Sequence, residues 1–359
     1  MNYTAPEQTR PQSKPRNHAF DLLCGLCILR MMLHHITGLT GQNTEWWNTL
    51  YYWSFYFMPF FFFKAGYFNK TIGGDSAKYC IDKAKRLLIP YFAWGIIGNI
   101  CYFGVMPFVV KRYHHPVEPL EWSHIWNESS FYGNAPIWFL LSFFCAYIIM
   151  HFMRKASTKT VTLRNGKKLS LLWIQWTVLL FPAISWWLFS IGNPLFLFLN
   201  NIFFGVFIFF LGHAWHWLLA RMRRRNTLML SIIITVAFCI LNVAIHGQYN
   251  MMNNKWMGNP YGMVINTTLA LCGLSGILLS LNIPRVPWLN FIGQHSMVFF
   301  VAHYPMLTLY RFITISNGRS LVGRLDDFII LCIIIPCLCA WLVPYVEKIP
   351  WLSGRFPKK

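Results

Sequence analysis

The chain has 359 residues, of which 56% are hydrophobic and only 12% are charged, and its mean hydropathy is +0.42. A soluble protein carries about twice that charged fraction, so the composition excludes a soluble enzyme and predicts an integral membrane protein. The formal net charge of +20 would suit a nucleic-acid-binding protein. However, the basic residues cluster at the ends of apolar segments, which is typical of membrane topology, so we expect no nucleic-acid partner.

The apolar residues come in blocks of about 20, the length of helix that crosses the ~30 Å hydrocarbon core of a bilayer. These blocks predict an all-α fold, a polytopic integral membrane protein with about ten transmembrane helices. The expected spans are 20–40, 50–68, 87–107, 135–153, 171–190, 195–218, 227–246, 260–281, 289–310 and 327–346.

Three parts of the chain follow from this pattern. Residues 1–18 are polar and contain three prolines, so we expect a disordered cytoplasmic arm and not a cleaved signal peptide. Residues 19–347 would form one transmembrane domain, and residues 348–359 a basic cytoplasmic tail. No polar stretch is long enough to form a separate soluble domain.

The basic residues also predict the orientation in the membrane. If the amino terminus is cytoplasmic, 23 of the 31 lysines and arginines fall in inside segments, six fall outside and two lie within spans. This bias is the one that the positive-inside rule requires, so we expect both termini in the cytoplasm. The expected outer loop 111–134 contains three histidines and three glutamates, but their spacing matches no metal site.

The first span carries the most informative residues. Asp21 stands at its start, Arg30 in its middle and His34–His35 near its end. Ionisable groups at membrane depth are costly and mostly face a protein interior or a water-filled cavity, so we interpret this helix as the wall of a functional site. Satisfied bundle histidines or interfacial histidines are the alternative.

Helical geometry separates these side chains into two stripes. Asp21 and His35 share one stripe, whereas Arg30 and His34 are four residues apart and share another, about 100° around the helix. We therefore expect the two histidines to point in different directions, with only one facing any given cavity.

Three residues of other spans are further candidates for the site, and two of them have an alternative structural role. Lys64 either extends to the cytoplasmic boundary or lines a site. Trp138 fits an interfacial tryptophan belt better than a substrate-stacking position. His303 is the histidine of the ninth expected span that approaches the depth of His35. Ala65–Gly66 and Gly205–Gly212 indicate close helix packing.

Five motifs are ordered along nearly the whole chain, from about Phe20 to Val346. They are Asp21 with His35 fourteen residues later, Phe60–Tyr67 (FFFFKAGY), Arg86–Pro90 (RLLIP), Trp138–Leu140 (WFL), and Gly293, Ser296, His303 and Pro305. Together they resemble the motifs of the membrane-bound acyltransferase-3 family, which includes bacterial integral-membrane acyltransferases.

This resemblance implies transfer of an acyl group, typically acetyl from acetyl-CoA, to a hydroxyl of a cell-surface or lipid-linked carbohydrate. The chain would lie in the cell (inner or plasma) membrane, with acyl-CoA as a co-substrate, no bound cofactor and no metal. His35 and Asp21 would be the catalytic residues, with His35 as general base or acyl relay. The donor and substrate would be bound by further residues, namely Arg30, His34, Lys64, Arg86, Trp138 and His303.

The sequence departs from the family pattern at Cys24, where an arginine or lysine is usual, and at Ala65, where serine is usual. Arg30, Lys64 and Arg86 are candidates to supply the missing cation. A transporter or flippase of a lipid-linked sugar is the alternative function, and a non-catalytic partner of a polysaccharide export complex is a third.

Overall fold

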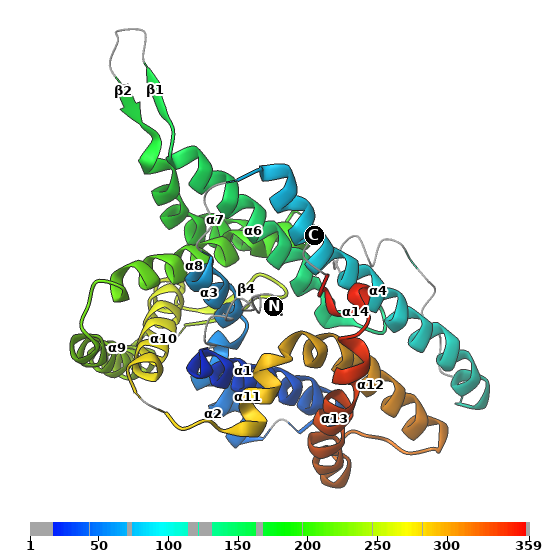
Figure 1. The fold of residues 1–359 in the computed structure, drawn as a ribbon. Helices are drawn as coiled ribbons and strands as arrows, with labels where there is room; N and C mark the ends of the chain where they lie inside the picture. Colours follow the sequence, from blue (N-terminus) through cyan, green and yellow to red (C-terminus); the bar gives the residue numbers. More distant parts are fainter. Residues whose placement is uncertain are drawn as a thin grey trace, which may run out of the picture.

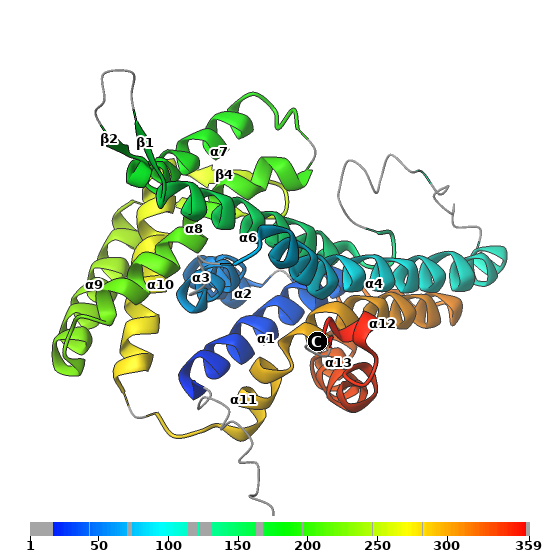
Figure 2. The ribbon, with the colours of Figure 1, turned by 45° about the horizontal axis from the view of Figure 1, so that its top comes forward.

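A computed structural model describes residues 17–42, 44–69, 74–113, 121, 131–162, 168–195, 197–245, 247–281 and 283–356. Within these ranges, nine helices are long and apolar enough to cross a membrane, so the predicted all-α polytopic membrane protein is confirmed. The helices pack around the first one, α1 (His18–Thr40), which runs through the centre of the bundle (Figures 1 and 2). Residues 1–16 of the expected arm 1–18 and most of the expected outer loop 111–134 lie outside the described residues.

The long helices fall near the expected positions, with ends that differ by a few residues. They are α4 (Ser76–Tyr113), α6 (Trp138–Ser157), α8 (Leu197–Leu219), α9 (Arg224–Ala244), α10 (Pro260–Ser280), α12 (Ser296–Ser316) and α13 (Leu325–Val346). Another span combines a 3-10 helix, η3 (Leu171–Leu180), with α7 (Phe181–Ser190). Short elements complete the set, namely η2 (Ala135–Ile137), α11 (Pro287–Gln294) and α14 (Pro350–Ser353).

The expected continuous span 50–68 is wrong. The chain instead forms α2 (Glu45–Ser54), a 3-10 turn η1 (Phe55–Phe57) and α3 (Pro59–Phe68). Pro59 stands at the first turn of α3, where its missing N–H needs no partner, and its ring would clash with the preceding turn of a continuous helix. The break turns the aromatic residues of η1 toward α1.

Two small antiparallel hairpins interrupt the helical fold, and the hydropathy pattern gave no signal for either. Strands β1 (Thr160–Thr162) and β2 (Lys168–Ser170) pair with Thr160 opposite Ser170 and project away from the bundle (Figures 1 and 2). Strands β3 (Gly247–Asn250) and β4 (Lys255–Gly258) pair with Gly247 opposite Gly258 and pack against α10.

The start of α1 and the end of the chain lie on the same side, because α11 and the residue after it contact both. The Asn290 amide donates to the His18 carbonyl at 2.8 Å, and His295 Nδ1 lies 2.5 Å from Glu347 Oε1. Arg355 pairs with the same Glu347 at 2.5 Å, so the basic C-terminal segment folds back onto the bundle.

Glycines allow two pairs of helices to cross at backbone contact. A Cβ on Gly66 of α3 would lie 1.8 Å from the Phe209 carbonyl oxygen, and one on Gly212 of α8 would lie 2.0 Å from the Phe63 carbonyl oxygen. The close packing predicted for both glycines is therefore confirmed. Gly293 of α11 packs in the same way on the backbone of α1, with the Asp21 carbonyl oxygen 1.8 Å from the position of a Cβ.

Candidate active site

His34 and His35 lie in the C-terminal half of α1 and line a large cavity. This outer cavity, as we call it, has a volume of about 850 Å³. Its wall is made by α1, α12 and the segment that follows α12. Tyr102 of α4 and Tyr132, which precedes η2, complete it. The lining residues are His34, His35, Gly38, Leu39, Tyr102, Tyr132, Tyr304, Leu307, Thr308, Arg311, Phe312, Ile315, Gly318, Arg319, Ser320, Leu321 and Val322.

The same two histidines line a second, much smaller cavity of about 80 Å³, which we call the inner pocket. Its wall is apolar and comes from η1, the start of α6, α12 and the β3–β4 hairpin. The lining residues besides the histidines are Met31, Tyr51, Phe55, Phe57, Met58, Pro59, Pro136, Trp138, Tyr249, Asn250, Met251, Met252 and Phe300.

The two cavities have only His34 and His35 in common among their lining residues. The inner pocket contacts α1 at Met31, one turn before the histidines, whereas the outer cavity contacts α1 at Gly38 and Leu39, one turn after them. The histidine pair therefore separates the cavities. The expectation that only one histidine faces a given cavity is wrong, because both residues line both cavities, with their ring centroids 5.4 Å apart.

His303 joins the pair from α12, as its predicted depth required. Its ring centroid lies 5.2 Å from that of His35, and its side chain is fully buried. His303 Nδ1 lies 2.8 Å from the Phe300 carbonyl oxygen, which can only accept a hydrogen bond, so Nδ1 carries the proton. Nε2 is then the unprotonated nitrogen, and it is buried without a partner among the described residues.

Arg30 lies one turn before His34 in an aromatic cage. Its guanidinium carbon stands 4.6 Å from the centroid of Trp47, 4.9 Å from that of Tyr51 and 4.5 Å from that of Phe57. Its Nε donates to Ser54 Oγ at 2.7 Å. Both terminal nitrogens are buried with no hydrogen-bond partner in the part of the chain that the structure describes.

The cage residues are shared with His34. Its ring stacks on Trp47 at 6.0 Å and lies 5.9 Å from Tyr51 and 6.4 Å from Phe57. Because Tyr51 and Phe57 also line the inner pocket, the charge of Arg30 stands directly behind the wall of that pocket. The break between α2 and α3 creates this arrangement.

The remaining predicted residues lie in three other places. Trp138 lines the inner pocket, so it is a site residue and not only a member of an interfacial tryptophan belt. Lys64 points inward, with its Nζ 2.8 Å from Cys24 Sγ, and the buried Asp21 is one turn before that cysteine. Asp21 and His35 are separated by roughly 21 Å of helix rise, at opposite ends of α1. Arg86 is exposed on α4, where its carbonyl contacts Gly354, and it lines neither cavity.

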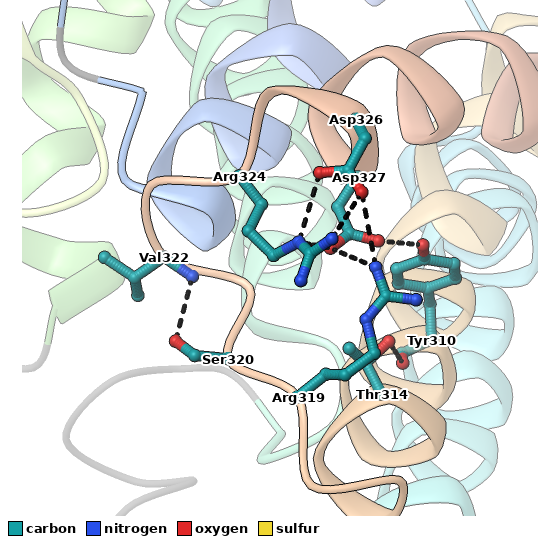
Figure 3. Close-up of polar contacts among 8 residues, drawn as sticks. All are labelled: Tyr310, Thr314, Arg319, Ser320, Val322, Arg324, Asp326 and Asp327. Atoms are coloured by element: carbon teal, nitrogen blue, oxygen red, sulfur yellow. Dashed lines mark hydrogen bonds and ion pairs between the residues drawn. The ribbon is translucent and has the colours of Figure 1, made fainter.

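A network of ion pairs holds the rim of the outer cavity (Figure 3). Arg319 lies 3.4 Å and Arg324 lies 3.3 Å from Asp327 Oδ2, and Tyr310 donates to Asp327 Oδ1 at 2.6 Å. Asp327 is buried, whereas both arginines are nearly half exposed. Asp326 also pairs with Arg324, at 2.7 Å, and this hydrogen bond raises the pKa of Arg324 above its usual value.

The rim network fixes the chain that turns from α12 into α13 and thereby the wall formed by Ser320 and Val322 (Figure 3). Arg311 also lines the outer cavity and has no ion-pair partner among the described residues. Sequence reasoning did not identify Arg311, Tyr304 or the methionines of the inner pocket as site residues. Tyr304 follows His303 directly, and that adjacency is the signal that could have found it.

Among the residues described, no group of three or more histidines, cysteines, aspartates or glutamates could hold a metal ion. The molecule is thus a polytopic membrane protein in which two half-buried imidazoles lie between a large outer cavity and a small, mostly apolar pocket. Residues 17–343 match the family described as an acyltransferase domain. Because the match covers nearly the whole chain, the chain belongs to the acyltransferase-3 family and is a membrane acyltransferase. A comparison with curated proteins found no significant match.

Proposed function

We propose that this membrane acyltransferase moves an acetyl group from acetyl-CoA to a hydroxyl of a cell-surface or lipid-linked carbohydrate, and that it works in the cell (inner or plasma) membrane. The observation that carries the proposal is the position of His34 and His35, which are shared by two otherwise separate cavities. An acyltransferase must bring two substrates to one catalytic group, and a group between two cavities meets this requirement.

The two cavities suit different parts of the reaction. The outer cavity is about ten times the volume of the inner pocket and presents tyrosines, a threonine and arginines, which can stack on sugar rings and bind their hydroxyls. The inner pocket is apolar and suits the acyl end of the donor. We therefore assign the carbohydrate to the outer cavity and the thioester to the boundary with the inner pocket.

His35 acts as the general base in this mechanism. It takes the proton of the acceptor hydroxyl as the oxygen attacks the thioester carbonyl carbon, and the carbon–sulfur bond then breaks. CoA leaves as a thiolate, which receives the proton from His35, so that an ester and free CoA are formed. His303, with an unprotonated Nε2 5.2 Å ring-to-ring from His35, orients the His35 imidazole or accepts its proton.

The cations assist from two depths. Arg30 supplies positive charge behind the wall of the inner pocket, where negative charge develops on the thioester oxygen. Lys64, at the other end of α1, is assigned to electrostatic attraction of the anionic donor, and Asp21 to the position of that helix end. Arg86 is exposed and lines neither cavity, and it is assigned to long-range attraction of the anionic donor.

The experiment compares surface glycans by mass spectrometry in cells that lack the protein and in cells that express variants. Deletion should remove an acetyl mass increment, the wild-type chain should restore it, and His35→Ala should not. His213→Ala is the matched control, because His213 is a half-buried helix histidine that lines neither cavity. An unchanged increment on deletion, or full restoration by His35→Ala, would contradict the proposal and favour a transporter.

A further inference from the structure

The inner pocket is small, is lined mostly by apolar side chains, and lies against His34 and His35. Four methionines contribute to its wall, namely Met31, Met58, Met251 and Met252, and the rest is largely aromatic or proline. An apolar cavity of ~150 Å³ holds one benzene ring with six heavy atoms. A volume of about 80 Å³ therefore has room for about three heavy atoms.

We infer that the inner pocket is the acyl-chain site and that the methionines of the β3–β4 hairpin limit the donor to a two-carbon acyl group. This inference rests on the proposed function and names the structural basis of its donor specificity. An acetyl group has three heavy atoms and fills the pocket, whereas a butyryl group has two more carbons and does not fit.

The hairpin is held firmly enough to act as such a limit. Asn254, fully buried in its turn, donates to the Ser185 carbonyl at 3.0 Å and to Asn193 Oδ1 at 2.7 Å. Its own Oδ1 accepts from Ser185 Oγ and from the Tyr249 hydroxyl, both at 2.7 Å. Burial raises the pKa of Tyr249, so its hydroxyl keeps the proton that it donates. The turn thus has every hydrogen-bonding position of its asparagine amide in use.

The bundle also has a place shaped for the hairpin. Gly205 of α8 leaves space for Met251, since a Cβ there would lie 3.1 Å from Met251 Cε. The ring of Tyr249 packs on Phe204 with centroids 4.5 Å apart, and Met251 itself is only 3% exposed. Met251 is therefore packed into the bundle from a fixed backbone, and it lines one side of the pocket.

Shortening that side chain should lengthen the pocket by a known amount. Met251→Ala removes three heavy atoms, which is more than the two carbons that distinguish butyryl from acetyl. Each methylene that gains a buried place contributes about fourfold in affinity. We therefore expect Met251→Ala to raise the affinity for butyryl-CoA relative to acetyl-CoA by roughly 15-fold.

The test measures competition for binding of radiolabelled acetyl-CoA to the full chain in lipid nanodiscs, with unlabelled CoA, acetyl-CoA, butyryl-CoA and hexanoyl-CoA as competitors. The wild-type protein should prefer acetyl-CoA, and Met251→Ala should shift the preference to butyryl-CoA. Met306→Ala is the matched control, because this half-buried methionine of α12 lines neither cavity and should leave the preference unchanged.

A second variant covers the case in which Met251→Ala does not fold. Met252 is half-buried at the same turn, and Met252→Phe should narrow the pocket and weaken acetyl-CoA relative to CoA itself. The inference is overturned if the wild type binds hexanoyl-CoA and acetyl-CoA with equal affinity, or if both folded variants keep the wild-type preference. In either case, binding of CoA itself would still support the proposed function. If neither CoA nor any acyl-CoA competes and labelled acetyl-CoA does not bind, the proposed function itself fails.

Discussion

A substitution of Arg30 should change activity much more than stability, because the terminal nitrogens of this residue are buried without hydrogen-bond partners among the described residues. Arg30→Met keeps much of the side-chain length but removes the charge. The two terminal nitrogens are buried and unpaired within the described structure, and removing such donors recovers roughly 1–3 kcal/mol each. The substitution also loses the contacts with the aromatic cage, about 2 kcal/mol, and the hydrogen bond to Ser54, about 1.5–3 kcal/mol.

These opposing contributions nearly cancel, so the unfolding temperature of Arg30→Met should stay within a few degrees of the wild-type value. Ser54 Oγ is not left without a partner, since it also donates to the Leu50 carbonyl at 2.5 Å. Acyl transfer, however, should fall about 10²–10³-fold, the usual cost of removing one group that stabilises developing negative charge.

Activity is measured as acetate incorporated into the surface glycan, and stability as the temperature at which the detergent-solubilised protein loses its monodisperse elution peak. Arg30→Lys is the matched variant, because it keeps a cation but loses the planar group that stacks between the rings. It should recover part of the activity. A variant Arg30→Met with full activity and a strongly lowered unfolding temperature would refute the assigned role and make Arg30 a structural residue.

Three further substitutions test the fold and the site. Gly212→Ala places a methyl group 2.0 Å from the Phe63 carbonyl oxygen, so α3 and α8 must separate and the yield of folded protein should drop sharply. Gly104→Ala, at an exposed glycine, is the control and should be tolerated. Asp327→Asn loses ion pairs with two half-exposed arginines, so the free energy of unfolding in a denaturation series should fall by about 1–2 kcal/mol, less than for a fully buried pair. High salt should reduce this difference in stability between the variant and the wild type. His303→Leu removes the unpartnered buried Nε2, so acyl transfer should fall at least ~10²-fold with little change in the unfolding temperature; retained activity would exclude His303 from proton transfer.

Much of the fold could be predicted from the sequence because bilayer thickness sets the length of apolar segments. The exception at 50–68 shows the limit of that reasoning. Hydropathy averages over a window and does not detect that Pro59 divides the segment into two helices with a 3-10 turn between them. The cage around Arg30 depends on this break, so its residues could not be assigned from periodicity.

The site was predictable at the residues with ionisable side chains and not at the apolar ones. His35, His303 and Arg30 stood out because such groups are costly at membrane depth. Met251 and Met252 carry no such signal, since methionine in a loop between two spans is ordinary. The pairing of β3 with β4, the hydrogen bonds of Asn254 and the packing of the hairpin on α8 place that loop beside the histidines. The angular separation of His34 from His35 on an ideal helix predicted that they face different cavities, but both residues line both cavities.

The departure at Cys24 leads to a last prediction. The family pattern has a cation at that position of the first helix, and here the Lys64 ammonium approaches Cys24 Sγ to 2.8 Å from α3. A charge at a given point in space acts on an anionic ligand in the same way whichever helix carries it. Lys64→Met should therefore weaken acetyl-CoA binding, and adding Cys24→Lys to Lys64→Met should restore much of it, whereas Cys24→Lys alone places two ammonium groups together and should destabilise the fold. Binding is measured by displacement of labelled acetyl-CoA from nanodiscs. If the double variant binds no better than Lys64→Met, the two positions are not equivalent, and Lys64 has a role that depends on its own helix.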